Sequence, residues 1–412
     1  MSGALTRAEC LAMDRQDPLA ALRERFHLPD GVIYLDGNSL GALPKQAVAR
    51  VDRAVREEWG RGLIRSWNDA GWYPAPSRVG AKIARLIGAA ADEVVVCDST
   101  SVNLFKVLVA ACRLRPGRRV ILSEQGNFPT NLYVGAGAAE LMGAELRRVA
   151  PGKLSEAMAA AGADLAALML THVNYRTGRM HDMAELTAQA HAQGALAIWD
   201  LSHSAGAMAL DLQRCGVDLA VGCGYKYLNG GPGAPAFVYV ARRHLAELRQ
   251  PLTGWLGHAR PFDFAEEYEP EPGILRMMAG TPPILALVAL EAALDVFAEV
   301  DMAAVRAKSV ALGDLFIRLV SELDGFGLAS PRDGALRGSQ VSITHPEGYA
   351  IMQALIARGV IGDFRPPDIL RFGFAPLYVG YADVWDAVAI LREVMQQRAW
   401  DIPEFAAKKA VT

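Results

Sequence analysis

Short, mostly apolar runs alternate with longer amphipathic segments through the middle of the chain. Each run is too short for a buried helix, and most are followed by apolar residues at helical spacing. The predicted strands are 93–97, 119–123, 145–149, 166–171, 196–200, 219–222 and 236–240, and the predicted helices are 102–113, 132–142, 154–161 and 183–193. This alternation predicts a mostly parallel sheet with helices on both faces.

The pattern changes on both sides of this region. Before it, residues 11–26 have helical spacing with a break or helix start at Asp17-Pro18, and a short strand and a helix follow at 32–36 and 44–59. After about residue 280, helices are predicted at 283–297, 302–323, 349–357 and 381–398, with strands at 340–344 and 369–374. We therefore expect an N-terminal segment (1–60) packed on a small α+β C-terminal domain (283–412), and a large domain between them (61–282).

Composition and charge narrow the classes of protein. The chain has 412 residues, of which 52% are hydrophobic and 21% charged, as in ordinary globular enzymes. A net charge of -3 without a basic stripe argues against nucleic acid or an anionic membrane as partner. Glu291 and Asp295 interrupt the longest apolar helical run, so it does not predict a membrane span.

The cysteines and the first residues bear on the compartment. Five cysteines are scattered without a C-x-x-C spacing, which favours a reduced, cytoplasmic setting. Acidic residues at 9, 14 and 17 and the lack of an apolar core near the start do not fit a secretory signal.

Polar residues gather where the predicted strands end. Ligands of open parallel sheets bind at the carboxyl ends of the strands. The residues found there are Ser99-Thr100-Ser101, Asn127 to Asn131, Thr171-His172, Asp200 with His203, and Tyr225-Lys226 in a glycine-rich turn. A lysine between two buried strands is costly unless it is paired, neutral or used covalently.

The sequence lacks the common nucleotide-binding, metal-binding and serine-hydrolase motifs, and its polar residues fit one cofactor. The sequence has no G-x-x-x-x-G-K-[ST], G-x-G-x-x-G, H-E-x-x-H or G-x-S-x-G motif, and its eight histidines lack metal-ligand spacing, so we expect no metal. Pyridoxal phosphate (PLP) needs a lysine for a Schiff base, a carboxylate for its ring nitrogen, an aromatic face and a phosphate cradle. Lys226, Asp200, Phe128 and the hydroxyls before the helix at 102 could supply these groups.

Each of these residues also has an ordinary structural interpretation. Lys226 could be an exposed turn lysine, and Asp200 a turn aspartate. Ser99 to Ser101 could be a plain helix cap, Phe128 a core residue and His203 a structural histidine. Their order along the chain, each at a strand end, favours the PLP site.

Several blocks resemble the kynureninase family of fold-type I PLP enzymes, in the class V-like aminotransferase superfamily. They include Asp200-Leu-Ser-His-Ser204, Gly224-Tyr-Lys-Tyr-Leu-Asn-Gly-Gly-Pro-Gly233, Leu35 to Gly41, Gly254-Trp-Leu-Gly-His258 and Leu370 to Tyr378. The resemblance spans nearly the whole chain. It implies an α/β fold with a mostly parallel seven-stranded sheet between helices, a large PLP-binding domain and a homodimer with active sites at the subunit interface.

The same resemblance implies roles for individual residues. Lys226 forms the Schiff base, Asp200 pairs with the pyridine nitrogen, Phe128 stacks on the ring, and Arg371 binds the substrate α-carboxylate through a bidentate pair. The remaining implied cofactor-binding residues are Thr100, Ser101, Pro129, Thr130, Asn131, Thr171, His203, Tyr225, Trp255 and Thr281, some of them from the partner subunit. Asn131 stands where the family usually has Asp, and Thr281 where relatives often have Asn.

The implied reaction is hydrolysis of L-kynurenine, or of its 3-hydroxy derivative, to anthranilate or 3-hydroxyanthranilate and L-alanine. Lys226 removes the α-proton, water adds to the γ-carbonyl and the β–γ carbon bond breaks. Tyr225 is the candidate to assist proton transfer. Trp67, Trp72 and Tyr73 either meet the substrate ring or pack between domains. The pathway would be tryptophan catabolism or NAD biosynthesis.

Three rival hypotheses remain at this point. A cysteine desulfurase needs a nucleophilic cysteine late in the chain and usually a histidine before the lysine, whereas Tyr225 precedes Lys226 and no cysteine follows Cys223. An aminotransferase would require a keto acid for turnover. A catalytically dead scaffold does not fit the retained Lys226, Asp200 and Arg371.

Overall fold

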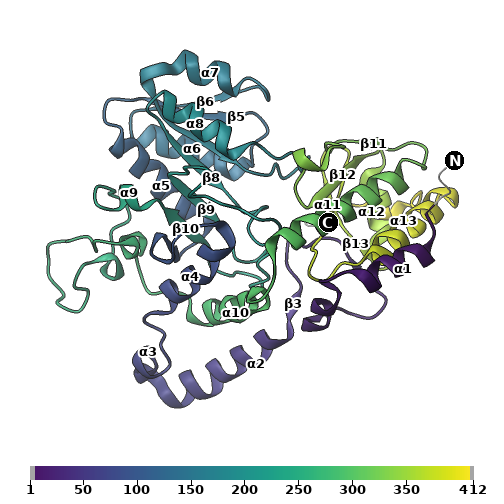
Figure 1. The fold of residues 1–412 in the computed structure, drawn as a ribbon, viewed down its shortest axis with the longest axis horizontal. Coiled ribbons are helices and arrows are strands. Elements are labelled where there is room, and N and C mark those ends of the chain that lie inside the picture. Colours follow the sequence, from purple (N-terminus) through teal and green to yellow (C-terminus); the bar gives the residue numbers. More distant parts are fainter. Residues whose placement is uncertain (1–4, 409–412) are drawn as a thin grey trace.

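A seven-stranded sheet forms the centre of the larger part of the molecule (Figure 1). The computed structural model describes residues 5–408. The strand order is β4-β10-β9-β8-β7-β5-β6, and only β10 runs antiparallel to its neighbours. The strands are β4 (Val94–Val96), β5 (Val120–Glu124), β6 (Glu145–Val149), β7 (Leu165–Thr171), β8 (Leu196–Asp200), β9 (Leu219–Gly222) and β10 (Phe237–Val240). The predicted mostly parallel sheet is confirmed.

Helices bury the sheet on both faces. Along β7, Leu168 and Leu170 belong to one hydrophobic cluster, while Ala167 and Met169 belong to another on the opposite face. Neighbouring residues of a strand point to opposite faces, so both faces are dry, which explains the near-continuous apolar sequence. The surrounding helices are α4 (Ala75–Ile87), α5 (Thr100–Leu114), α6 (Pro129–Leu141), α7 (Leu154–Ala161), α8 (Met183–Ala192) and α9 (Arg242–Leu245).

The C-terminal part is built on a second, antiparallel sheet of order β11-β12-β15-β14. Its strands are β11 (Gly327–Leu328), β12 (Gln340–Thr344), β14 (Asp363–Arg365) and β15 (Ile369–Gly373). The accompanying helices are α11 (Met302–Val320), α12 (Gly348–Ile356), α13 (Tyr381–Gln396) and α14 (Pro403–Ala406), whereas α10 (Ile284–Leu294) packs on α4 beside the large sheet (Figure 1). None of the helices within residues 5–408 is both long and apolar enough to cross a membrane.

The N-terminal residues pack in two places. Helix α1 (Arg7–Gln16) lies on α13, where the Asp14 carboxylate accepts hydrogen bonds from the backbone N–H groups of Tyr381 and Ala382. Helix α2 (Lys45–Arg53) continues as a π-helix (Ala54–Gly62), packs against α10 and is followed by α3 (Ser66–Asp69), as Figure 1 shows. Two short pairs complete this region, β1 (Phe26–His27) with β3 (Leu43–Pro44) and β2 (Ile33–Tyr34) with β13 (Val360–Ile361).

The loop between β2 and β3 connects the two sheets. Asp36 forms a β-bridge with Gly373 at the end of β15. The Gly41 N–H donates to the Tyr225 carbonyl at 2.8 Å, in the loop after β9. Residues 36–41 therefore touch both β15 and the glycine-rich turn at the end of the large sheet.

Candidate active site

Lys226 lies in the turn after β9, with its amine pointing at a buried histidine. The turn is tight: a Cβ at Gly224 would lie 2.5 Å from the Pro235 carbonyl oxygen, so only glycine fits there. Lys226 Nζ is 2.9 Å from His203 Nε2, and His203 Nδ1 is 3.0 Å from Gln340 Oε1. Because an amide oxygen only accepts, Nδ1 carries the proton and Nε2 accepts from the lysine.

Burial lowers the pKa of both groups in this pair. The pKa of His203 falls well below its usual range because the ring is buried, and the charges of Lys226 and Arg371 act in the same direction. The pKa of Lys226 is also lowered, first by burial, with Arg371 and Arg365 adding to the effect and Cys223 and Asp200 opposing it. The imidazole is therefore neutral, and the lysine loses its proton more easily than an exposed lysine.

The Asp200 carboxylate is held one strand away at the end of β8. It accepts hydrogen bonds from Asn131 Nδ2 at 2.8 Å and from the Ser202 N–H at 2.9 Å. Asn131 Nδ2 also contacts Thr171 Oγ1 at 3.1 Å, and all three side chains are buried. The amide at 131 thus donates to Asp200, which an ionised carboxylate at that position could not do.

Phe128 brings an aromatic face to the amine. Its ring centroid lies 6.0 Å from Lys226 Nζ, and its edge meets Tyr175 at 5.2 Å between centroids. Asn127, to which no role was assigned from the sequence, fixes this loop by accepting from the Phe128 N–H at 2.7 Å and donating to Ser123 Oγ at 3.0 Å. Pro129 and Thr130 then begin α6.

The hydroxyls of Thr100 and Ser101 lie at the start of α5. Ser99 is the N-cap, and its side chain accepts from the Val102 N–H. Sequence reasoning missed Lys106, whose fully buried amine pairs with Asp98 and donates to the Met277 carbonyl at 2.6 Å. A lysine within an otherwise apolar helix segment was the available signal. The pair anchors the turn that leads into the helix.

Arg371 is buried on β15, with its guanidinium already paired. Its Nε donates to Asp363 Oδ1 at 2.8 Å, and its Nη2 donates to Asp363 Oδ2 and, at 2.7 Å, to Ser39 Oγ. Its Nη1 donates to the Tyr175 carbonyl at 2.7 Å, leaving one Nη1–H without a partner among residues 5–408. The edge that makes a bidentate pair is therefore occupied by Asp363, and a further carboxylate would meet Nη1.

A second carboxyl lies beside this pair and was not predicted. Burial raises the pKa of Asp36 to about 7, the charge of Asp363 adds to this effect, and Arg371 opposes it. Asp36 Oδ1 is buried and has no hydrogen-bond partner among the residues that the structure describes. The Arg371 region thus contains two carboxyl groups.

Trp255 and Thr281 lie apart from these residues. Their segments touch each other, since Gly254 packs on the Ala279 carbonyl and the Leu256 N–H donates to it. Both side chains are exposed, and within residues 5–408 no hydrogen bond or ring contact joins either to Lys226 or Phe128. The structure therefore brings the other predicted residues toward one end of the sheet but not these two.

Tyr225 is adjacent to the lysine in space as well as in sequence. Its ring centroid is 5.9 Å from Lys226 Nζ, and its carbonyl accepts from Gly41. Burial raises the pKa of the phenol, with the charges of Cys223 and Asp200 adding to the effect. The phenol therefore keeps its proton at neutral pH and is able to donate it.

The combined donor set suits one kind of ligand. An amine lies 6.0 Å from the centre of an aromatic ring, a carboxylate lies at the end of the neighbouring strand, and a helix N-terminus with two hydroxyls can bind a dianion. These groups fit an aldehyde cofactor that has a protonated aromatic ring and a phosphate.

Comparison with solved structures defines the class. The chain superimposes on the cystine C–S lyase C-DES, a mutant of which was solved with glycine covalently linked to the PLP cofactor, with a TM-score of 0.78 and 18% identity over 90% of this chain and 99% of that one. A cysteine desulfurase of Escherichia coli gives 0.76 and 19% over 96% and 100%. The chain has the fold of the fold-type I PLP enzymes.

Sequence comparison narrows this class to one family. The chain is 55% identical to the kynureninase of Pseudomonas fluorescens over 99% of this chain and all of that protein, and 54% identical to that of Burkholderia mallei over the same shares. The family model for the kynureninase C-terminal domain matches residues 305–391. The chain belongs to the kynureninase family, as its motifs predicted.

Proposed function

We propose that this protein is a PLP-dependent hydrolase that cleaves L-kynurenine, or its 3-hydroxy derivative, to the corresponding anthranilate and L-alanine. The observation that carries the proposal is full-length identity above 50% to kynureninases, together with a partly buried amine beside a buried carboxylate at the sheet end. When bound, PLP supplies an aldehyde for the substrate amine and a protonated ring that accepts electrons from the α-carbon.

The residues that would hold the cofactor come from consecutive strand ends. Lys226 would bind it covalently, Asp200 would face its ring nitrogen and Phe128 would cover its ring. Thr100 and Ser101 would hold its phosphate at the start of α5. Further contacts would come from Thr171, His203, Tyr225 and the loop residues Pro129, Thr130 and Asn131.

Proton transfers can be assigned to groups with suitable pKa values. The lowered pKa of Lys226 means that its Nζ is more often free to accept the substrate α-proton than the amine of an exposed lysine would be. Neutral His203 accepts a hydrogen bond from that amine and orients it. Tyr225 keeps its phenolic proton and can donate it as the γ-carbonyl is attacked by water. Arg371 would bind the α-carboxylate through its Nη1 edge, and the buried Asp363 would hold it in place.

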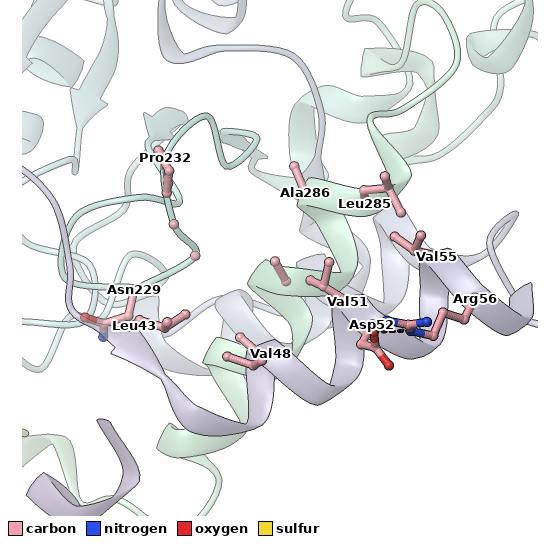
Figure 2. Close-up of a pocket in the computed structure, with 14 residues that line it drawn as sticks. Leu43, Val48, Val51, Asp52, Val55, Arg56, Asn229, Pro232, Leu285 and Ala286 are labelled. Carbon is pink, nitrogen blue, oxygen red and sulfur yellow. Dashed lines mark hydrogen bonds and ion pairs between the residues drawn. The ribbon is translucent and has the colours of Figure 1, made fainter. Parts of the chain in front are cut away.

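We also infer that the protein acts as a homodimer with its active sites at the subunit interface. Trp255 and Thr281 would reach the phosphate of the partner's site, because both are exposed and apart from Lys226 in one chain. An apolar groove of about 850 Å³ supports this, lined by α2, the start of α10 and the turn at Asn229 to Pro232, which follows Lys226 (Figure 2). A reduced, cytoplasmic setting fits the five cysteines, which form no disulfide within residues 5–408.

Purified protein loaded with PLP tests the activity directly. With L-kynurenine and no added keto acid, we expect fluorescence from anthranilate and one alanine per anthranilate. Lys226→Ala should lose this activity and the visible absorbance of the lysine-linked cofactor. Lys153→Ala, which removes an exposed lysine paired with Glu156, should keep both.

Three results would contradict the proposal. Turnover only in the presence of a keto acid would indicate an aminotransferase. A PLP-loaded protein that forms no anthranilate would not be a kynureninase. Normal turnover by Lys226→Ala would remove that lysine from the reaction.

A further inference from the structure

We propose that binding of the substrate's carboxylate beside Arg371 is coupled to uptake of a proton by Asp36, so that this site binds carboxylates more weakly as the pH rises. The inference rests on the proposed function in one respect, namely that Arg371 receives the carboxylate. It adds a regulation of that site by pH and assigns Asp36 as a positioning residue that acts through Arg371.

The connection between Asp36 and the arginine is structural. The backbone of Asp36 bridges to Gly373, two residues after Arg371 on the same strand, and its carbonyl accepts from the Ser39 N–H at 2.9 Å. Ser39 Oγ accepts from Arg371 Nη2 and donates to Asp363 Oδ2 at 2.8 Å. The loop that carries Asp36 is therefore part of the hydrogen-bond network around the guanidinium.

The charged groups around Asp36 come from several elements. Asp363 and Arg365 on β14, Arg371 on β15 and the nearby Ser39 hydroxyl act on the pKa of its carboxyl group. The phenols of Tyr34, Tyr227 and Tyr378 also interact with it, and all three keep their protons because burial raises their pKa values. Arg365 donates to Asp363 Oδ2 at 2.7 Å, so that carboxylate serves two arginines.

The net charge of this cluster depends on Asp36. With Asp36 protonated, one carboxylate faces two guanidinium groups, and the cluster has a charge of +1 that an incoming carboxylate can neutralise. With Asp36 ionised the cluster is neutral, and an incoming carboxylate makes it negative in a buried setting. Like charges in low dielectric raise each other's pKa, so a bound carboxylate makes Asp36 retain its proton.

The sign and size of the effect follow from this linkage. Burial and Asp363 raise the pKa of Asp36 to about 7, so the carboxyl is mostly protonated at pH 6 and mostly ionised at pH 8. Below this pKa binding takes up almost no proton and affinity is constant. Above it, uptake approaches one proton per ligand and the dissociation constant rises about tenfold per pH unit.

A ligand without an α-amino group isolates this linkage, because it cannot react with the cofactor aldehyde. We would titrate PLP-loaded protein with 4-(2-aminophenyl)-4-oxobutanoate, which is kynurenine lacking its α-amino group, by calorimetry between pH 6 and 8.5 in two buffers with different ionisation enthalpies. We expect uptake of about 0.9 proton at pH 8 and a dissociation constant about eightfold higher at pH 8.5 than at pH 7.5. In Asp36→Asn, uptake and the change in dissociation constant should both disappear.

The visible spectrum identifies the group that takes the proton. Protonation of the Lys226 linkage would change the absorbance of the cofactor, whereas protonation of Asp36 would not. Proton uptake that persists in Asp36→Asn, or that is matched by an absorbance change in the unmodified protein, would overturn the proposal, and so would affinity independent of pH. The spectral comparison needs only the unmodified protein, so a matching absorbance change would overturn the proposal even if the variant does not fold.

The same measurements separate this proposal from the proposed function. If the protein binds the acid with proton uptake but never forms anthranilate, the hydrolase assignment fails and the Asp36 inference stands. If it forms anthranilate while binding takes up no proton, the reverse holds.

Discussion

Two Arg–Asp pairs in this protein have the same bidentate geometry but differ in burial, so they can test how burial affects the contribution of an ion pair to stability. Arg371 pairs with Asp363 through Nε and Nη2, and Arg7 pairs with Asp386 through the same two nitrogens at 2.7 and 2.8 Å. Side-chain exposure is 2% and 5% in the first pair but 51% and 29% in the second. Replacing Asp363 or Asp386 by Asn removes the negative charge from its pair and keeps a side chain of nearly the same shape.

The expected cost of the two changes differs widely. Asp363→Asn leaves the buried Arg371 cation without its counterion, for which breakage of a buried pair typically costs about 3–5 kcal/mol. At an unfolding entropy of about 2.1 cal/mol/K per residue, a chain of this length loses about 3–6 °C of melting temperature for that cost. Asp386→Asn removes a solvent-screened pair, so its melting temperature should be unchanged within error.

Asp36 offers a check on the reasoning behind these numbers. If Asp36 can ionise and replace the lost counterion, the loss of stability in Asp363→Asn will lie at the low end of the expected cost. The double variant Asp36→Asn/Asp363→Asn should then lose more than the sum of the two single changes, because the two carboxyls share one partner.

The assay is thermal unfolding of PLP-loaded protein at one scan rate, since unfolding of a chain of this size need not be reversible. Michaelis constants for kynurenine should be measured in parallel, and Asp363→Asn should raise this constant more than it lowers kcat. Equal shifts of melting temperature in Asp363→Asn and Asp386→Asn would refute the argument from burial. A Michaelis constant unaffected by Asp363→Asn would show that Asp363 does not position Arg371 for the substrate.

Two further changes probe groups outside the proposed chemistry. Lys106→Met should weaken PLP binding several-fold in a fluorescence titration. The variant lacks the amine that pairs with Asp98 and donates to the Met277 carbonyl just before Thr100. Unchanged affinity for PLP would show that this pair has a structural role only. Burial, with the charge of His181 acting in the same direction, lowers the pKa of His172 to about 3. Between pH 6.5 and 3 this histidine is therefore protonated in the unfolded chain but neutral in the folded one. The free energy of unfolding then falls by up to about 1.4 kcal/mol for each unit by which the pH is lowered. His172→Gln should therefore flatten the fall of melting temperature between pH 7 and 5, and an equally steep fall would contradict this.

The sequence predicted strands better than it predicted one of the helices. The boundaries of β6, β8, β9 and β12 agree with the structure to the residue, because buried strands are marked by apolar runs that end at polar or glycine residues. Helix α4 was not predicted. Gly80 in its middle packs flat on the Val94 carbonyl, but Val79, Ile83 and Ile87 are buried at helical spacing, so the apolar signal was present in the sequence. The antiparallel direction of β10 is likewise invisible locally, since parallel and antiparallel buried strands have the same composition.

The candidate site divides in a similar way. Residues at successive strand ends could be grouped from the sequence, because parallel strands place their carboxyl ends along one edge, and the structure brings Asn131, Thr171 and Asp200 into one hydrogen-bond network. Gln340, Asp363 and Asp36 were missed, since each joins the site only when the second sheet and the N-terminal loop pack against the first. No local pattern encodes such contacts between distant parts of a chain.

Judged by its fold alone, this protein would have been grouped with the cysteine desulfurases. A desulfurase superimposes on almost the whole chain, yet at 19% identity this likeness extends to architecture and no further. The local chemistry separates the two classes, because a desulfurase needs a thiolate late in the chain and no cysteine follows Cys223 here. Tyr225 occupies the position before the lysine, and burial keeps its phenol protonated. Predictions about the activity of this protein should therefore be tested at the residues around Lys226.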